Sequence, residues 1–329
     1  MTKPLLQALA LEPLPRPPVW IMRQAGRYLP EYREIRERHS FQEAVSTPEV
    51  AARITMQPID RFDMDGAVIF ADIMTPLEAM GVPMTFDPGP KLEPLTLASI
   101  AELPDLDTSR VAHVAETIAL VFEAVPDHTA VIGFAGAPVT LLAYLLEGGG
   151  SKDFMSMRAA LRGEPELART ALDRLARSMN VYLRAQIEAG AEVVQLFDTW
   201  AGLLDVDTYR DMAVPAAQDS LEGLGVPAIY FAPGAGHTLV TQAKIGATGY
   251  GVDWRVSIAD AFDVFSGHAV QGNLDPSVLR GDPDTVEQAV RGLLEEAGGR
   301  AGHIMNLGHG IDRHTPPENV AVFVEAVRS

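Results

Sequence analysis

Eight short apolar runs in this 329-residue chain are each followed by residues that could hold or activate a small molecule. In chain order, these residues are Arg23, Asp72, Gly136, Asp198 with Thr199, the stretch 234–237, Asp253, Asn273, and the triplet Gly308, His309 and Gly310. Guanidinium groups bind carboxylates and phosphates through paired hydrogen bonds, and Asp and His move protons or stabilise charge. The set favours an anionic small-molecule ligand that carries several carboxylates.

Most of these residues also have a structural interpretation. Asp72 comes directly after an apolar run, so it is equally well placed to cap the next helix. We interpret Asp198 and Asp253 as members of supporting or capping networks. His309 is harder to explain in this way, because its two flanking glycines allow close backbone approach or unusual dihedral angles. We therefore expect His309 to face the ligand.

Positive charge is concentrated near the beginning of the chain. Six arginines lie within 23 residues, namely Arg16, Arg23, Arg27, Arg33, Arg36 and Arg38, whereas the formal net charge of the whole chain is −18. For Arg33 and Arg38 we expect ion pairs with Glu31, Glu34 or Glu37 along a solvated helix. The acidic total argues against a nucleic-acid partner and against an anionic membrane surface.

Several common chemistries lack their sequence signature. The chain has no cysteine, which removes thiolate zinc sites, thiol nucleophiles and disulfides. There is no H-E-x-x-H or G-x-S-x-G motif, although a zinc site built from distant His and Asp residues stays open. Neither a dinucleotide fingerprint nor a phosphate-binding P-loop is present, and residues 246–251 (GATGYG) have the glycines in the wrong order.

The apolar runs are short enough to be buried parallel strands, and amphipathic helical patterns separate them. The predicted strands are 19–22, 67–71, 130–134, 193–197, 228–232, 249–252, 269–272 and 303–306. The clearest helical pattern starts at Pro165 and stops before Gly190. Pro48 indicates another helix start, and Ser46 and Glu49 before and after it have the spacing of a capping box. Eight strand–helix units predict a single (β/α)8 TIM barrel over residues 18–329, after an irregular lead-in at 1–17. A doubly wound sheet is the alternative.

One stretch, residues 129–146, is apolar and nearly as long as a membrane span. Gly133, Gly136 and Pro138 divide it, so we expect a strand, a loop and a helix start instead of a membrane helix. The apolar run near the N-terminus is too short for a secretory signal, and the absence of cysteine fits a reducing cytoplasm.

Five long motifs and two shorter ones resemble the uroporphyrinogen decarboxylase family of haem and chlorophyll biosynthesis. They are PVWIMRQAGRYLPEYRE at 18–34, VIFADI at 68–73, GFAGAPVTLLAYLLEGGGSK at 133–152, FDTWAG at 197–202, NLGHGI at 306–311, GVDW at 251–254 and QGNLDP at 271–276. The resemblance implies a homodimeric barrel enzyme that uses no cofactor and no metal. Its reaction would convert the four acetate side chains of uroporphyrinogen III to methyl groups, giving coproporphyrinogen III and four CO2.

The resemblance also implies roles for particular residues. Arg23, Arg27 and Arg36 would bind substrate carboxylates, and Asp72 would face the pyrrole N–H groups. Tyr144, Thr199 and His309 would line the site, so that Asp72, Arg23, Tyr144 and His309 are the candidate catalytic residues. The proton donor stays open between an arginine, a substrate carboxyl group and a water molecule. Some family members have serine at the position of Thr199 and histidine at that of Trp200.

Two other functions are compatible with the same fold. A methyltransferase of the same superfamily would use a zinc site that contains cysteine, which this chain lacks. A non-catalytic tetrapyrrole carrier would be expected to have lost the charge-stabilising aspartate, yet Asp72 is present in its motif.

Overall fold

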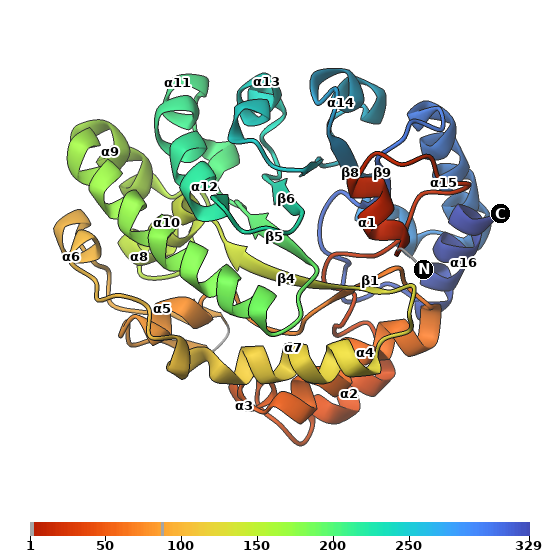
Figure 1. Ribbon diagram of the computed structural model, residues 1–329, viewed down its shortest axis with the longest axis horizontal. Helices are drawn as coiled ribbons and strands as arrows, with labels where there is room; N and C mark the ends of the chain where they lie inside the picture. Colours follow the sequence, from red (N-terminus) through yellow and green to blue (C-terminus); the bar gives the residue numbers. More distant parts are fainter. Residues whose placement is uncertain (1–2, 87–88) are drawn as a thin grey trace.

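The computed structural model describes residues 3–86 and 89–329, and its centre is a curled parallel sheet (Figure 1). Seven strands follow one another in the order β1-β4-β5-β6-β7-β8-β9, and every neighbouring pair is parallel. Their bounds are Gly66–Val68 (β1), Ala130–Gly136 (β4), Val193–Phe197 (β5), Ala228–Phe231 (β6), Gly249–Gly251 (β7), Ala269–Leu274 (β8) and His303–Leu307 (β9). This sequential order is that of a barrel and differs from that of a doubly wound sheet.

Residues 19–22, predicted as the first strand, form only an isolated bridge. Val19 pairs in parallel with Met305 of β9, and its carbonyl accepts from the Asp65 N–H immediately before β1. Side chains take the N–H groups that a strand would use, because Val19 N donates to Asp65 Oδ2 at 2.7 Å and Met22 N donates to Asn306 Oδ1 at 3.0 Å. The (β/α)8 TIM barrel prediction is confirmed, and a single bridge takes the place of its first strand.

The other strands form because their apolar runs are buried on both faces, as a parallel sheet covered by helices requires. All seven residues of β4 are buried, and all five of β9. The prediction for β5 matches the observed bounds, and β8 runs two residues farther than predicted. The run predicted at 67–71 gives only Gly66–Val68, and Phe70 N donates to the hydroxyl of Thr55 at 2.9 Å.

Helices surround the sheet, and a small antiparallel pair, Thr85–Phe86 (β2) and Pro90–Lys91 (β3), lies outside it. The helices up to the middle of the chain are Pro4–Leu9 (α1), Pro30–Arg36 (α2), Phe41–Ser46 (α3), Pro48–Phe62 (α4), Thr75–Ala79 (α5), Leu97–Ala101 (α6), Ala112–Ala124 (α7), Pro138–Glu147 (α8), Met155–Gly163 (α9) and Pro165–Glu188 (α10). The later ones are Val206–Thr208 (α11), Val214–Leu221 (α12), Leu239–Gln242 (α13), Ile258–Val264 (α14), Pro283–Ala297 (α15) and Pro317–Arg328 (α16). Short 3-10 or π turns lie at Thr108–Val111 (η1), Ala201–Leu203 (η2), Tyr209–Ala213 (η3), Gly236–Thr238 (η4), Ala243–Ile245 (η5) and Pro276–Arg280 (η6).

Of the predicted helix signals, one is confirmed and one is wrong. Helix α10 begins at Pro165 and ends before Gly190, as predicted. The capping box predicted at Ser46 and Glu49 is wrong, since Thr47 is the N-cap of α4 without a side-chain bond. The box lies one helix earlier, where Ser40 accepts from the Glu43 N–H at the start of α3.

The predicted irregular lead-in contains a helix, which corrects the prediction for residues 4–9. Helix α1 starts at Pro4, buries Leu5, Ala8 and Leu9, and contacts β9. Just before it, Lys3 forms a 2.6 Å ion pair with Glu192, which adjoins β5. A helix forms here because the apolar residues recur at helical spacing and find a surface to cover at the end of the barrel. The assignment of residues 18–329 to one domain stays a prediction.

The apolar stretch 129–146 becomes strand β4, a short loop and most of helix α8, as its glycines and proline predict. Among the helices in the described ranges, none combines the length and the apolar character needed to span a bilayer.

Candidate functional site

Four predicted site residues gather at the carboxyl ends of the strands. Arg23 follows the bridge at Val19, Asp72 follows β1, Tyr144 lies on α8 after β4, and His309 follows β9. The charges of Arg23 and Asp72 both act on the pKa of Tyr144, and the charge of Arg23 acts on those of Asp72 and His309. Arg23 is therefore the member that links the other three.

Asp72 is a half-buried carboxylate at the turn that leads into α5. Burial raises its pKa, whereas a hydrogen bond from Met74 N at 2.8 Å and the nearby Arg23 charge act in the opposite direction. The helix-capping interpretation is wrong, because Met74 is the N-cap of α5 and none of the described side chains caps this helix. Oδ1 of Asp72 instead stabilises the turn before the helix. Oδ2 makes no hydrogen bond within the described chain, so Asp72 can support its turn and still present an oxygen to a ligand.

Arg23 has a left-handed backbone conformation, with φ of 63°, which is uncommon outside glycine. Gln24 stabilises this turn, because its side chain accepts from Ile21 N at 3.0 Å and donates to Gly66 O at 2.8 Å. The Arg23 side chain passes over Gly310, where a Cβ atom would overlap it. A larger residue at position 310 would therefore have to displace the Arg23 side chain, and the glycine after His309 lets the arginine lie against this loop.

His309 is half-buried, and burial lowers its pKa, with further lowering by the charges of Arg23 and Arg255. The neutral imidazole is favoured in this surrounding, with one nitrogen as donor and the other as acceptor. On its other side, Gly308 lies so close to Trp254 that a Cβ atom would sit 2.6 Å from the Trp254 amide nitrogen. The prediction that flanking glycines permit close approach is confirmed.

Thr199 directly precedes Trp200, whose ring contacts that of Tyr144. Trp200 packs edge-on against Tyr144, with ring centroids 6.2 Å apart, and its ring is tilted against that of Phe154, with centroids 4.5 Å apart. Below it, Asp198 is almost fully buried and accepts from Thr140 Oγ1 and from Tyr230 Oη, both at 2.8 Å. These contacts agree with our interpretation of Asp198 as a supporting residue.

The remaining arginines are placed differently. Arg36 donates to Tyr32 Oη at 3.1 Å and lies over the ring of Phe41, which contacts Phe70 two residues before Asp72. Arg36 is therefore connected to the segment that carries Asp72 by the contacts of Phe41 and Phe70. The Arg27 side chain is exposed, and no ion pair in the described ranges includes it.

The expected ion pairs of Arg33 and Arg38 with neighbouring glutamates are wrong. Arg33 donates to the carbonyls of Arg27 and Tyr28, and Glu31 pairs with Arg61 of α4. For Arg38, the described ranges contain no ion pair. The helix is too short for the expected pairing, because α2 ends at Arg36 and leaves Arg38 beyond its last turn.

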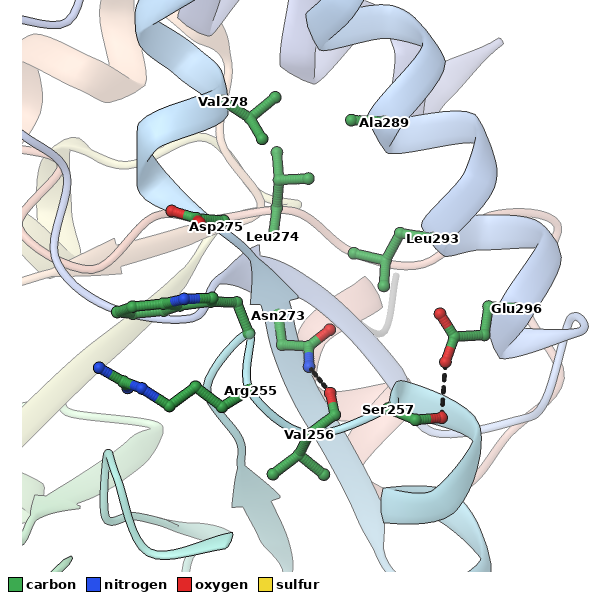
Figure 2. A pocket seen from close by; sticks show the side chains of 11 residues that line it. Arg255, Val256, Ser257, Asn273, Leu274, Asp275, Val278, Ala289, Leu293 and Glu296 are labelled. Carbon is green, nitrogen blue, oxygen red and sulfur yellow. Dashed lines mark hydrogen bonds between the residues drawn. The ribbon is translucent and has the colours of Figure 1, made fainter.

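A pocket of about 510 Å³ lies beside this group of residues, between the end of β8 and helices α14 and α15 (Figure 2). Its floor is apolar, with Leu274, Val278 and Leu293, and Ser257 donates to Glu296 at its edge at 2.6 Å. Arg255 stacks on Trp254 at 4.2 Å and pairs with the buried Asp253. Sequence analysis did not predict this pocket, because its walls come from three separate segments. In the described ranges, no three His, Asp or Glu side chains cluster closely enough to hold a metal ion.

The family model described as Uroporphyrinogen decarboxylase (URO-D) matches residues 1–329. This chain belongs to the uroporphyrinogen decarboxylase family. A family member named uroporphyrinogen decarboxylase from Syntrophotalea carbinolica is 45% identical over 322 residues, covering 96% of this chain and 94% of the relative. One of the same name from Streptomyces avermitilis is 44% identical, covering 98% and 93%.

Solved structures outside this close set share the fold. A methyltransferase from Methanosarcina mazei superposes with a TM-score of 0.84 at 23% identity, covering 98% of this chain and 97% of that chain. A putative vitamin-B12-independent methionine synthase from Listeria monocytogenes has a TM-score of 0.60 at 13% identity, covering 99% and 98%. At these identities the likeness shows a common barrel fold and nothing about chemistry.

Proposed function

We propose that this chain is a carboxy-lyase that removes the carboxyl groups of the four acetate side chains of uroporphyrinogen III. The products are coproporphyrinogen III and four CO2. The observation that carries the proposal is the half-buried Asp72 carboxylate with Arg23 close to it, at the strand ends of a chain in this family. A carboxylate beside a guanidinium suits a substrate that presents N–H groups at its centre and carboxylates around its edge.

In the proposed reaction the substrate pyrrole is the electron sink, so the chemistry needs no cofactor. A proton adds to the ring carbon that lies between the nitrogen and the carbon bearing the acetate arm, and the resulting positive charge is conjugated through the ring to the nitrogen. The bond between the methylene carbon and the carboxylate then breaks, and its electron pair moves into the ring and neutralises the nitrogen. A second proton adds to the exocyclic methylene carbon and the first leaves the ring, so that hydrogen replaces CO2.

The roles of the residues follow from these charges. The Asp72 carboxylate stabilises the cationic pyrrole more than the neutral one, which lowers the barrier. The charge of Arg23 favours the ionised form of Asp72, against the effect of burial. In our proposal Arg23, Arg27 and Arg36 bind substrate carboxylates, and Tyr144, Thr199 and neutral His309 supply hydrogen bonds from the walls.

The test is an anaerobic assay with freshly reduced uroporphyrinogen III, whose products are oxidised and separated by carboxyl number. We expect a ladder from eight carboxyl groups to four, slowed roughly 10²- to 10³-fold in Asp72→Asn because one preorganised charge is lost. Asp263→Asn, which changes an exposed carboxylate on α14, is the matched control and should keep full activity. If the octacarboxylate is bound tightly but stays unchanged, the carrier function is favoured. If the protein neither converts nor binds it, both functions are contradicted.

We also propose that the chain works as a homodimer in the cytoplasm, with the two sites facing one another. Large apolar side chains remain exposed on segments that follow successive strands, namely Val206, Val240 and Trp254, with 44%, 72% and 36% of their surface accessible. Apolar groups gathered at one end of a barrel are typical of a surface that a partner covers. The cysteine-free composition is compatible with a reducing compartment.

A further inference from the structure

Trp200, the residue after Thr199, contacts aromatic side chains from two other segments of the site. Trp200 follows β5, whereas Tyr144 and Phe154 come from α8 and from the residue before α9. The three rings contact one another, with centroid distances of 5.8 Å for Tyr144–Phe154, 6.2 Å for Tyr144–Trp200 and 4.5 Å for Phe154–Trp200. Phe154 is fully buried, so this cluster has a fixed base.

The backbone of Trp200 is attached to the same helix. Thr140 and Tyr144 are four residues apart on α8 and therefore share one face of it. Thr140 Oγ1 accepts a hydrogen bond from the backbone N–H of Trp200 at 3.1 Å and donates one to the carboxylate of Asp198 at 2.8 Å. Trp200 is thus attached at two points, by its amide to Thr140 and by its ring to Tyr144.

A buried network supports this attachment from below. Asp198 also accepts from Tyr230 Oη at 2.8 Å, and Tyr230 is bonded to Tyr209 at 2.7 Å. Both tyrosines are fully buried. Residues 198–200 cannot shift without breaking several buried hydrogen bonds, so the direction of the Trp200 ring is well defined.

The indole N–H of Trp200 is the unexplained feature. Its Nε1 atom is buried and has no acceptor within hydrogen-bond geometry among the described residues. The indole ring packs edge-on against the Tyr144 ring, and Trp200 lowers the pKa of the Tyr144 phenol against the larger effect of burial, which raises it. Hydrogen bonds of active sites are often long or bent without substrate and tighten when it binds.

We propose that Trp200 is a positioning residue that donates its indole N–H to the phenolic oxygen of Tyr144 when substrate is bound. An accepted hydrogen bond at that oxygen leaves the Tyr144 proton free to point away from Trp200, toward a substrate carboxylate. Trp200 then acts through Tyr144 and does not touch the reacting atoms. This inference rests on the proposed function, because it takes Tyr144 to contact the substrate.

The test is a double-mutant cycle with Trp200→Phe and Tyr144→Phe. Trp200→Phe keeps an aromatic ring against Phe154 and removes the N–H donor together with the second ring of the indole. Loss of one neutral hydrogen bond is worth about 0.5–1.5 kcal/mol, so we expect kcat/KM to fall roughly two- to tenfold. In the Tyr144→Phe background the same substitution should have no further effect, since the acceptor is already gone.

The outcome of the cycle and a further variant, Trp200→His, distinguish a positioning role from a packing role. An equal loss in both backgrounds, or no loss in the wild-type background, would overturn the proposal, because a packing role does not need the phenolic oxygen. Trp200→His, which keeps a ring N–H, should recover part of the lost activity, and it replaces Trp200→Phe if that variant does not fold.

The failure of the proposed function is a separate outcome. If the wild-type chain does not decarboxylate uroporphyrinogen III, the same cycle is measured on the binding of oxidised uroporphyrin III, followed by porphyrin fluorescence. The inference then requires the two substitutions to be coupled in Kd, and independent effects would overturn it.

Discussion

At the scale of single residues, Asp198 shows how much a side chain's chemistry depends on its neighbours. Its carboxyl group is almost fully buried and accepts from two neutral hydroxyl groups, those of Thr140 and Tyr230. No ion pair in the described ranges includes it. Burial without a counter-charge raises its pKa from 3.8 to about 6, so the ionised form destabilises the fold.

This pKa leads to a prediction about stability. Between about pH 4 and 6 the folded state holds a proton on Asp198 that the unfolded state has lost, so stability contributed by this group falls as pH rises. The full difference is about 3 kcal/mol, and about half of it develops between pH 5 and 7.5. Relative to the wild type, Asp198→Asn should therefore gain 1–2 kcal/mol (roughly) in free energy of unfolding over that interval.

Urea unfolding of both proteins at the two pH values measures this difference. His303, whose pKa burial lowers to about 4, contributes with the opposite sign, but it is present in both proteins and cancels. A stability difference that does not change with pH would contradict the raised pKa of Asp198.

At the scale of elements, side-chain hydrogen bonds help to close the barrel where the isolated bridge at Val19 takes the place of a strand. Asp65 has no exposed surface, and its carboxylate accepts from Val19 N and from both terminal nitrogens of Arg16, at 2.7 and 3.0 Å. This one carboxylate joins the lead-in, the bridge residue and the start of β1. A sequence pattern predicts apolar strands, but it does not predict that a side chain will replace a ladder bond.

Substitution of Arg16 should therefore weaken the whole barrel. In Arg16→Met the Asp65 carboxylate keeps its place in the interior without its cation, which typically costs about 3–5 kcal/mol. Thermal or urea unfolding measures this change. Arg291→Met, which breaks an exposed pair with Glu287 on α15, is the control and should cost less than about 0.5 kcal/mol. Equal, small effects in both variants would show that Arg16 is not needed for closure.

At the scale of the whole molecule, charge and apolar surface are distributed unevenly. The net charge is −18, yet Arg23 and Arg36 lie at or near the site. Their guanidinium groups act on a bound substrate at short range, whereas salt screens the more distant acidic charge. The same end of the barrel carries the exposed Val206, Val240 and Trp254. An anionic substrate and a partner subunit would thus approach the same end.

The proposed homodimer can be tested by sedimentation. We expect a species of twice the 35.4 kDa chain mass at micromolar protein concentration. Val240→Asp, which places a charge on the most exposed of the three side chains, should shift the equilibrium toward monomer because a charge at an apolar interface is costly. Leu120→Asp on α7 is the matched control, since this exposed apolar residue lies on an outer helix. Only monomer in the wild type would contradict the proposal.

The sequence by itself determined the alternation of buried strands and helices and the candidate residues at their ends, because apolar periodicity and short motifs are local properties. It also indicated that the long apolar stretch is a strand followed by a helix. Only the tertiary structure decided that the first strand is a single bridge, that Arg33 binds carbonyls instead of glutamates, and that Trp200 faces Tyr144. Those outcomes depend on which groups meet once the chain has folded, and no local pattern specifies such contacts.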